Sequence, residues 1–287
     1  MNPALLGMAG SLSWGTLDYI SRFPSRQVGH LNTVFAATVV GLVLLTGWMM
    51  LGGYELKAHW PTLWLVALSG IGSALATMWL FAALAIGPIS VVSPIAASYP
   101  ALSVGYAFAM GSRPSVLEWI AMAAVMAGVF VVSRVATGPS DAARAERDNI
   151  AKVVPLALMS SLAFAIALTA GQAAAPIYGE VQTTWFARLF GAAVLLMFFA
   201  RPSERFDLPV RWWPVFLVMG ALDVGGMVTI VAAGHLPQAE IAQVTGSTFG
   251  VITVLLGRFL LKEQVSWLRW GGIALIFAGV AVLSAHG

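Results

Sequence analysis

The chain has 287 residues, of which 59% are apolar and only 9% are charged, with a formal net charge of +3 and no cysteine. Soluble globular proteins carry about 25% charged residues, so this composition excludes a soluble protein and predicts one that crosses a membrane several times. Without cysteine, a disulfide framework and a thiolate metal site are excluded as well.

Apolar runs of about 20 residues, the length that crosses the hydrocarbon core of a bilayer, recur along the whole chain. From them we predict an all-α membrane protein with ten transmembrane helices. The predicted helices cover residues 3–22, 32–51, 62–85, 89–110, 115–134, 153–174, 181–200, 212–234, 238–260 and 266–285.

The polar stretch from Thr137 to Lys152 interrupts this series near its middle. It contains a Gly138-Pro139 turn and several charged residues, which do not fit a membrane-spanning helix. We therefore interpret residues 135–152 as a linker between two repeats, which cover residues 1–134 and 153–287.

The two halves are related by an internal duplication. A shift of 150 residues aligns Ser11-Leu12 with Ser161-Leu162, Trp14 with Phe164 and Phe35 with Trp185. A shift of 151 residues aligns the last spans, where Trp119 meets Trp270. Because each copy has five spans, an odd number, the second copy enters the membrane in the opposite direction. Two inverted five-helix repeats around a central cavity are typical of secondary transporters.

Basic residues gather on one side of the predicted membrane topology. That side receives Arg22, Arg26, Arg134, Arg144, Arg147, Lys152, Arg201, Arg205, Arg211, Arg258, Lys262 and Arg269. The other side receives Lys57 and Arg113. Because Lys and Arg accumulate in cytoplasmic loops, we predict that both termini lie outside a multi-pass protein of the plasma membrane.

Several catalytic classes need motifs that the sequence lacks. No lysine follows a glycine as in a phosphate-binding P-loop, which argues against an ATP-driven pump. The four histidines are isolated, and no Gly-x-Ser-x-Gly occurs, which argues against a zinc enzyme and a serine hydrolase. We expect no enzyme activity, no cofactor, no metal and no nucleic-acid partner. The expected partners are a small-molecule substrate and the lipid bilayer, with protons as a candidate coupling ion and a monomer or weak homo-oligomer as the assembly.

The fourth and ninth spans are interrupted by glycine and proline at matching positions, as in the broken helices that frame transporter cavities. We expect these residues to act as hinges, and they are Pro88, Pro94, Pro100, Pro237, Gly246 and Gly250. At helical spacing each span presents a stripe of small or polar residues, Ser90, Ser93, Ala97 and Pro100 in one and Glu240, Gln243, Ser247 and Gly250 in the other. Such stripes serve close helix packing as well as cavity lining, and the sequence leaves both open.

Ionisable residues inside spans are costly and are therefore candidates for function. Arg188 and Asp223 lie well inside the seventh and eighth spans, where the two could pair. We interpret them as charges that gate transport, with a structural salt bridge or snorkelling as the alternative. Asp18 shares a face with Trp14, but it lies close to the cytoplasmic end of its span. For Asp18 we favour a solvated helix end over a proton site.

Aromatic and polar residues inside the spans are the candidates for substrate binding, with ordinary packing as the alternative for each. Trp14 and Trp79 lie deep within their spans, where an indole N–H needs a partner or a wet cavity. The aromatic candidates are Trp14, Trp79, Tyr99, Phe164 and Trp185, and the polar ones are Ser93, Ser98, Gln243, Ser247 and Thr248. We expect the first, third, fourth, sixth, eighth and ninth spans to form the cavity.

The chain resembles the EamA-type ten-helix members of the drug/metabolite transporter superfamily over its whole length. The segments that carry this resemblance are 99–102 (Tyr-Pro-Ala-Leu), 256–263 (Leu-Gly-Arg-Phe-Leu-Leu-Lys-Glu), Arg188 and 271–274 (Gly-Gly-Ile-Ala). The acidic residue that the family places after the fourth span is Ser112 or Arg113 here, whereas the second repeat keeps it as Glu263.

In length and cavity aromatics the chain is similar to the bacterial aromatic amino acid exporters of that superfamily. The similarity implies a bacterial inner-membrane location and export of aromatic and other neutral amino acids by alternating access. Export of other drugs or metabolites, a facilitative pore and, as the least favoured, a membrane-embedded enzyme are the alternatives. Coupling to protons and facilitated diffusion both remain open.

Overall fold

The computed structural model describes residues 2–56, 59–102, 115–132, 141–201, 204–236 and 240–286, and every regular element within these ranges is helical. The helices are α1 (Pro3–Gln27), α2 (His30–Leu51), α3 (Leu63–Ile86), α4 (Ile89–Ala96), α6 (Val116–Val132), α7 (Asp141–Tyr178), α8 (Glu180–Phe199), α9 (Trp213–Ala232), α10 (Glu240–Ser247), α11 (Phe249–Leu260) and α12 (Trp267–His286), with 3-10 turns η1 (Trp60–Thr62), η2 (Val210–Trp212) and η3 (Ala233–His235). The prediction of an all-α chain is confirmed.

Six helical segments of the described chain are long and apolar enough to cross a membrane. They are His30–Leu51, Trp60–Ile86, Asp148–Tyr178, Glu180–Phe199, Val210–His235 and Ile241–Leu260, and shorter apolar helices cover Ile89–Leu102, Trp119–Val131 and Trp267–Val282. Together with α1, these helices coincide with the predicted spans wherever the structure describes them.

Two predicted boundaries differ from the structure, because α1 continues to Gln27, past its predicted end at residue 22, and α7 begins before the predicted sixth span. Helix α7 begins at Asp141, so the later part of the segment that we predicted as a linker is helical. This part is rich in Ala, Arg, Glu and Lys, which favour a helix even outside the membrane. Residues 135–140 lie outside the described part of the chain.

The turn between the first two spans is built in the same way in both repeats. Gly29 ends the turn between α1 and α2, and Gly179, exactly one repeat later in the alignment, ends the turn between α7 and α8. Their φ angles are +91° and +78°, in the left-handed region that glycine adopts without steric cost. The duplication is therefore visible in the backbone as well as in the side chains.

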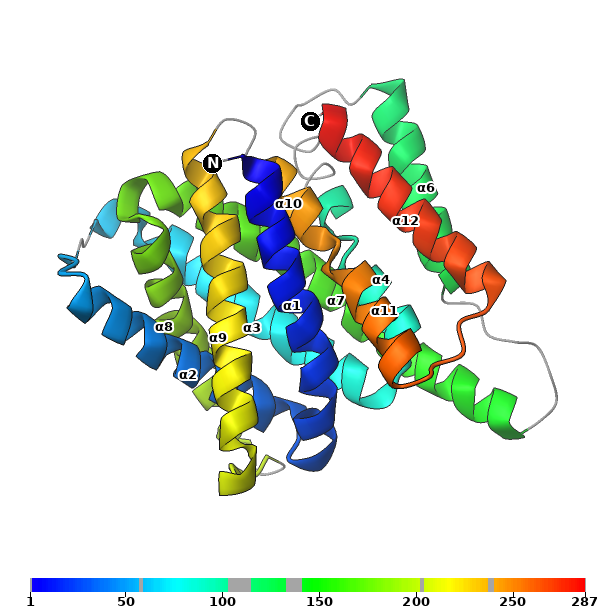
Figure 1. Ribbon diagram of the computed structural model, residues 1–287, viewed down its shortest axis with the longest axis horizontal. Helices are drawn as coiled ribbons and strands as arrows, with labels where there is room; N and C mark the ends of the chain where they lie inside the picture. Colours follow the sequence, from blue (N-terminus) through cyan, green and yellow to red (C-terminus); the bar gives the residue numbers. More distant parts are fainter. Residues whose placement is uncertain are drawn as a thin grey trace.

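The helices of the two repeats interleave in one bundle and do not form two separate bundles. Helix α1 of the first repeat packs against α9, α10 and α11 of the second, while α3 packs against α7 and α8. Figure 1 shows the first turn of α1 and the last turn of α12 at the same end of the bundle, and α6 and α12 side by side at one flank. The centre of the molecule is thus surrounded by helices of both repeats.

Candidate functional site

An ion pair lies in the centre of the bundle. The guanidinium of Arg188 on α8 is 3.0 Å from the carboxylate of Asp223 on α9, and their side chains are only 5% and 10% exposed. The predicted pairing of these two residues is confirmed. Trp14, whose deep indole was expected to need a partner or a wet cavity, borders the same internal pocket as this pair.

A glycine makes room for that indole. A Cβ atom at Gly226, one turn after Asp223 on α9, would overlap the Trp14 ring nitrogen. The Gly-rich part of the eighth span is therefore explained by the close approach of Trp14 to the helix backbone.

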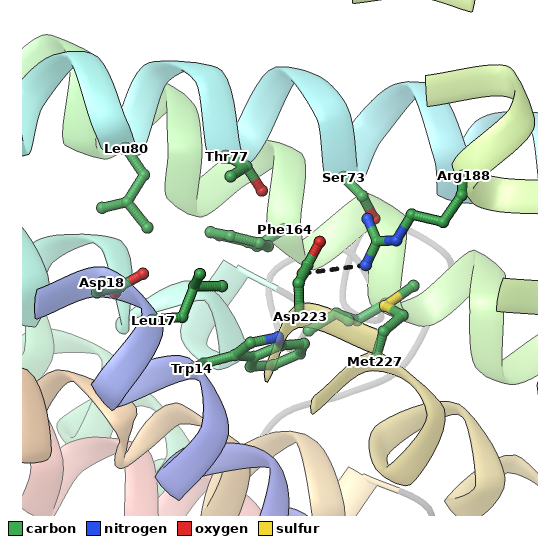
Figure 2. A pocket seen from close by; sticks show the side chains of 11 residues that line it. Trp14, Leu17, Asp18, Ser73, Thr77, Leu80, Phe164, Arg188, Asp223 and Met227 are labelled. Carbon is green, nitrogen blue, oxygen red and sulfur yellow. Dashed lines mark ion pairs between the residues drawn. The ribbon is translucent and has the colours of Figure 1, made fainter. Parts of the chain in front are cut away.

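These residues border an internal pocket, shown in Figure 2. The lining side chains come from α1, α3, α7, α8 and α9, and they are Trp14, Leu17, Asp18, Ser73, Thr77, Leu80, Phe164, Leu168, Arg188, Asp223 and Met227. The pocket offers about 20 Å³ to the centre of a water molecule, which is room for water and not for an organic substrate. The structure therefore represents a closed conformation of this pocket.

The lining residues are related to one another by the duplication. Four pairs of them stand 150 residues apart, namely Trp14 with Phe164, Asp18 with Leu168, Ser73 with Asp223 and Thr77 with Met227. The pocket thus lies where the two inverted repeats meet around their common axis. The two members of a pair differ in chemistry where one is acidic, because Asp18 corresponds to the apolar Leu168 and Asp223 corresponds to the hydroxyl residue Ser73.

Asp18 departs from the sequence prediction of a solvated helix end. Its side chain is buried, with 3% of the residue exposed, and its Oδ2 atom has no hydrogen-bond partner. The prediction was wrong because α1 continues to Gln27, so Asp18 lies more than two turns before the end of the helix. In Figure 2 the carboxyl group points into the pocket from α1, on the opposite side from the ion pair.

Four aromatic rings form a cluster, and two of them, Trp14 and Phe164, belong to the pocket lining. Trp14 lies 6.3 Å from Phe164 and 6.2 Å from Phe249, measured between ring centroids, and Tyr99 lies 6.2 Å from Phe164. Sequence reasoning selected three of the four and missed Phe249. The signal was present, because Phe249 stands 150 residues after Tyr99, just as Phe164 stands 150 residues after Trp14.

The polar candidates are mostly engaged with the protein itself. Ser98, Ser247 and Thr248 each donate to a backbone carbonyl three residues earlier. Gln243 donates to Gln172, and its backbone carbonyl accepts the hydroxyl of Tyr99 at 2.5 Å. These residues lie outside the lining of the pocket in this conformation, so their role in binding stays a prediction.

The contacts of Gly250 distinguish between the two interpretations of the small-residue stripes, close helix packing and cavity lining. A Cβ atom at Gly250 would lie 2.8 Å from the Cβ of Ala97 and 2.9 Å from the carbonyl oxygen of Ser93. The fourth and ninth spans therefore pack closely against each other at this crossing. They do not line the pocket, contrary to our expectation, whereas Arg188 brings in the seventh span, which we had not expected.

Two aromatic candidates lie elsewhere. Trp79 is half-buried and packs against the main hydrophobic core. The indole of Trp185 donates a 2.9 Å hydrogen bond to Thr46, and its ring lies 5.1 Å from that of Phe186. Neither side chain lines the pocket.

The predicted hinges lie at breaks in both spans. Helix α4 contains Pro94 and ends at Ala96, just before Pro100, and Pro88 precedes its first residue. The ninth span is divided at Thr248, between α10 with Gly246 and α11 with Gly250. The two interruptions match in the duplication, because Ser98 and Thr248 stand 150 residues apart. Pro237 lies outside the described residues, and the gating role of the others stays a prediction.

A second ion pair lies at the end of the bundle opposite both termini. Arg22 on α1 is 3.2 Å from the carboxylate of Glu263, and its guanidinium also donates to the carbonyl of Gly87 at 2.9 Å. The carboxylate of Glu263 accepts the backbone N–H groups of Ile89 and Ser90 at 3.2 and 3.4 Å, which caps the first turn of α4. The left-handed backbone of Lys262, with φ at +57°, turns the chain after α11 so that Glu263 reaches this position.

Comparisons with known proteins agree with this architecture. The family model described as "EamA-like transporter family" matches residues 1–134 and again residues 151–285. A segment of the chain is 36% identical over 107 residues to an uncharacterized transporter of Pseudomonas aeruginosa, covering 35% of this chain and 34% of that protein. Another is 32% identical over 81 residues to the probable 4-amino-4-deoxy-L-arabinose-phosphoundecaprenol flippase subunit ArnE of Pseudomonas fluorescens, covering 28% of this chain and 67% of that protein.

A solved crystal structure shares the fold. The two superpose with a TM-score of 0.65 at 19% identity, over 98% of this chain and 95% of the other. The match with the first curated relative spans about a third of that protein's length.

Proposed function

Because the chain belongs to the EamA-like transporter family, we propose that it is a secondary exporter of aromatic and other neutral amino acids that works by alternating access. The family makes it a membrane-embedded transporter of small molecules. The substrate class, the direction and the mechanism are our proposal, together with a bacterial inner-membrane location and termini outside the cell.

The observation that carries the proposal is a pocket lined by both repeats through pairs of residues 150 apart. A site on the axis between inverted repeats becomes accessible from either side when one repeat rocks against the other. The breaks at Ser98 and Thr248 would let the fourth and ninth spans bend during that motion. A pore would not require such a closed central site.

The chemistry of the pocket suits an aromatic compound with polar ends. Trp14 and Phe164 supply ring faces within the wall, and Tyr99 and Phe249 lie behind them. Arg188 supplies a cation, and its Nε atom has no hydrogen-bond partner, while Asp18 supplies a polar carboxyl group. In the proposed substrate complex the pocket opens, the ring stacks on Trp14 and Phe164, and the carboxylate of an amino acid accepts from Arg188.

Counterflow in liposomes tests the proposal. Vesicles containing the purified protein and unlabelled phenylalanine or tryptophan should accumulate the labelled amino acid, with saturation and competition among aromatic amino acids. Flux that rises linearly with concentration would indicate a pore instead. Lack of any exchange by an inserted, folded protein would remove the aromatic amino acids and direct the search to other drugs and metabolites.

A pair of tryptophan variants makes the test specific to the pocket. Trp14→Phe removes the indole N–H and part of the ring surface that lines the pocket, so we expect weaker exchange of aromatic substrates. Trp185→Phe makes the same substitution at an indole that lies nearer the start of its helix and is bonded to Thr46, away from the pocket, and it serves as the control. Equal effects of both variants, or of neither, would contradict the role of the pocket aromatics.

A further inference from the structure

The pocket carries one uncompensated negative charge. Its lining contains two carboxyl groups, Asp18 and Asp223, and one cation, Arg188, while the remaining lining residues are apolar or carry hydroxyl groups. The Arg188 guanidinium is engaged with Asp223 at 3.0 Å. With both carboxyl groups ionised, the net charge of the lining would be −1, and the excess charge would belong to Asp18.

No neighbouring group compensates Asp18. The Oδ2 atom is buried without a partner, and the helices around the pocket present Ser73, Thr77, Phe164 and Leu168 to it in addition to the ion pair. The next cation along α1, Arg22, lies one turn further and is already bound to Glu263 and to the carbonyl of Gly87. Asp18 is therefore the one lining carboxyl group of the described residues that lacks a cationic partner.

Packing does not explain an acid at this position. The residue that the duplication places opposite Asp18 is Leu168, which lines the same pocket and is itself buried. An apolar side chain thus satisfies the equivalent place in the other repeat. An isolated ionised carboxylate inside a membrane bundle costs several kcal/mol, so its presence calls for a cation or a proton.

We propose that Asp18 is a cation-binding position that holds a proton when the pocket is empty and the ammonium group of an aromatic amine when the pocket is loaded. This inference rests on the proposed carrier function and extends its substrates to aromatic amines. When the amine enters as a monocation, the Asp18 carboxyl group releases its proton to water, and the carboxylate accepts the ammonium. The lining and its occupant are then neutral together in both states.

The charge count separates an amine from an amino acid. A zwitterion has no net charge, so its binding leaves the proton on Asp18, whereas a monocation displaces that proton. Phenethylamine and phenylalanine carry the same ring but differ in net charge. Phenethylamine is a monocation at neutral pH, because an alkylammonium group, like that of lysine, stays protonated there, whereas phenylalanine is a zwitterion. Amine binding should therefore strengthen as pH rises, by up to tenfold per pH unit, while phenylalanine binding should not.

Titration calorimetry of the purified protein with phenethylamine tests the proposal. In buffers of different ionisation enthalpy, the wild type should release close to one proton per amine bound, and phenylalanine should release none. Asp18→Asn should abolish the release, flatten the pH dependence and weaken amine binding at least tenfold. Asp18→Glu keeps a carboxyl group at this position and should retain the proton release. Glu55→Gln, which alters an exposed loop carboxylate, is the control and should behave as the wild type.

The outcomes separate this inference from the proposed function. Phenylalanine counterflow without phenethylamine binding, or amine binding with no proton release by the wild type, overturns the role of Asp18 and leaves the exporter intact. Amine binding with proton release but no amino acid counterflow supports Asp18 and removes the amino acid assignment. If Asp18→Asn does not fold, the proton release of the wild type and of Asp18→Glu decides the question by itself.

Discussion

At the end of the bundle opposite both termini, Arg22 pairs with Glu263, whose carboxylate also caps α4. At the end where the termini lie, the residue related to Arg22 by the duplication is Gln172, and it accepts a hydrogen bond from Gln243 and donates to the carbonyl of Ile230 at 3.1 Å. The ionic closure joins the two repeats, because Arg22 lies in the first and Glu263 in the second, whereas Gln172, Gln243 and Ile230 all lie in the second repeat. One closure is ionic and the other is neutral.

The difference shows how the two ends of an inverted duplication can come to differ in stability. Two identical repeats would open equally toward both sides, because each conformation would have a mirror partner of equal energy. Here an ion pair between the repeats lies at one end, and amide hydrogen bonds within the second repeat lie at the other, so the two ends are unequal. In the proposed alternating-access cycle, this inequality would set the balance between the two open states through a few side chains outside the pocket.

Loss of the ionic closure should give the largest effect. Glu263→Gln leaves Arg22, whose side chain is 11% exposed, without its counter-ion and weakens the cap of α4. Breaking a buried pair in this way costs about 3 kcal/mol or more, which shifts the closed-to-open ratio by roughly a hundredfold. Because the chain lacks cysteine, a Ser90→Cys reporter at the buried start of α4 should then react much faster with a maleimide.

The swap Arg22→Glu with Glu263→Arg provides a check on that experiment. It keeps the charges of the pair while it removes the carboxylate cap of α4, so the reporter should react at a rate between those of the wild type and Glu263→Gln. Unchanged labelling in Glu263→Gln would show that Arg22 and Glu263 do not hold this end closed.

Loss of the neutral closure should have a smaller effect. Gln172→Ala removes two buried hydrogen bonds between uncharged groups, which contribute about 1 kcal/mol each. A Ser247→Cys reporter, buried on α10 near this closure, should therefore gain roughly thirtyfold or less in labelling rate. A gain larger than that of Glu263→Gln at its own end would reverse the proposed order of the two closures.

The architecture could be predicted from the sequence because the duplication and the apolar runs depend only on which residue type stands at each position. The positions of the spans along the chain, the central ion pair of Arg188 with Asp223 and the matched helix breaks all follow from patterns of that kind. The same shift of 150 residues would also have identified Phe249 as the partner of Tyr99.

The rest depends on distances that a single sequence does not contain. Asp18 was judged by its position in a span whose end was placed too early, and its burial follows only from how α3, α7 and α9 surround it. Likewise, a stripe of small residues reads the same whether it faces a cavity or another helix. The contact of Gly250 with Ala97 resolves that ambiguity in favour of packing.

The smallest effect is expected at a third pair, which lies at the same end as Gln172. The imidazole of His235 is 3.2 Å from the carboxylate of Glu180, but the two side chains are 40% and 38% exposed. Exposed pairs contribute about 0 to 1 kcal/mol and are screened by salt, and this one is fully ionic only when the imidazole is protonated. Glu180→Gln should therefore change the labelling of the Ser247→Cys reporter by less than about fivefold, and not at all in high salt. An effect as large as that of Gln172→Ala, lost when salt is raised, would mean that surface charge closes this end too, and the contrast between an ionic and a neutral closure would no longer hold.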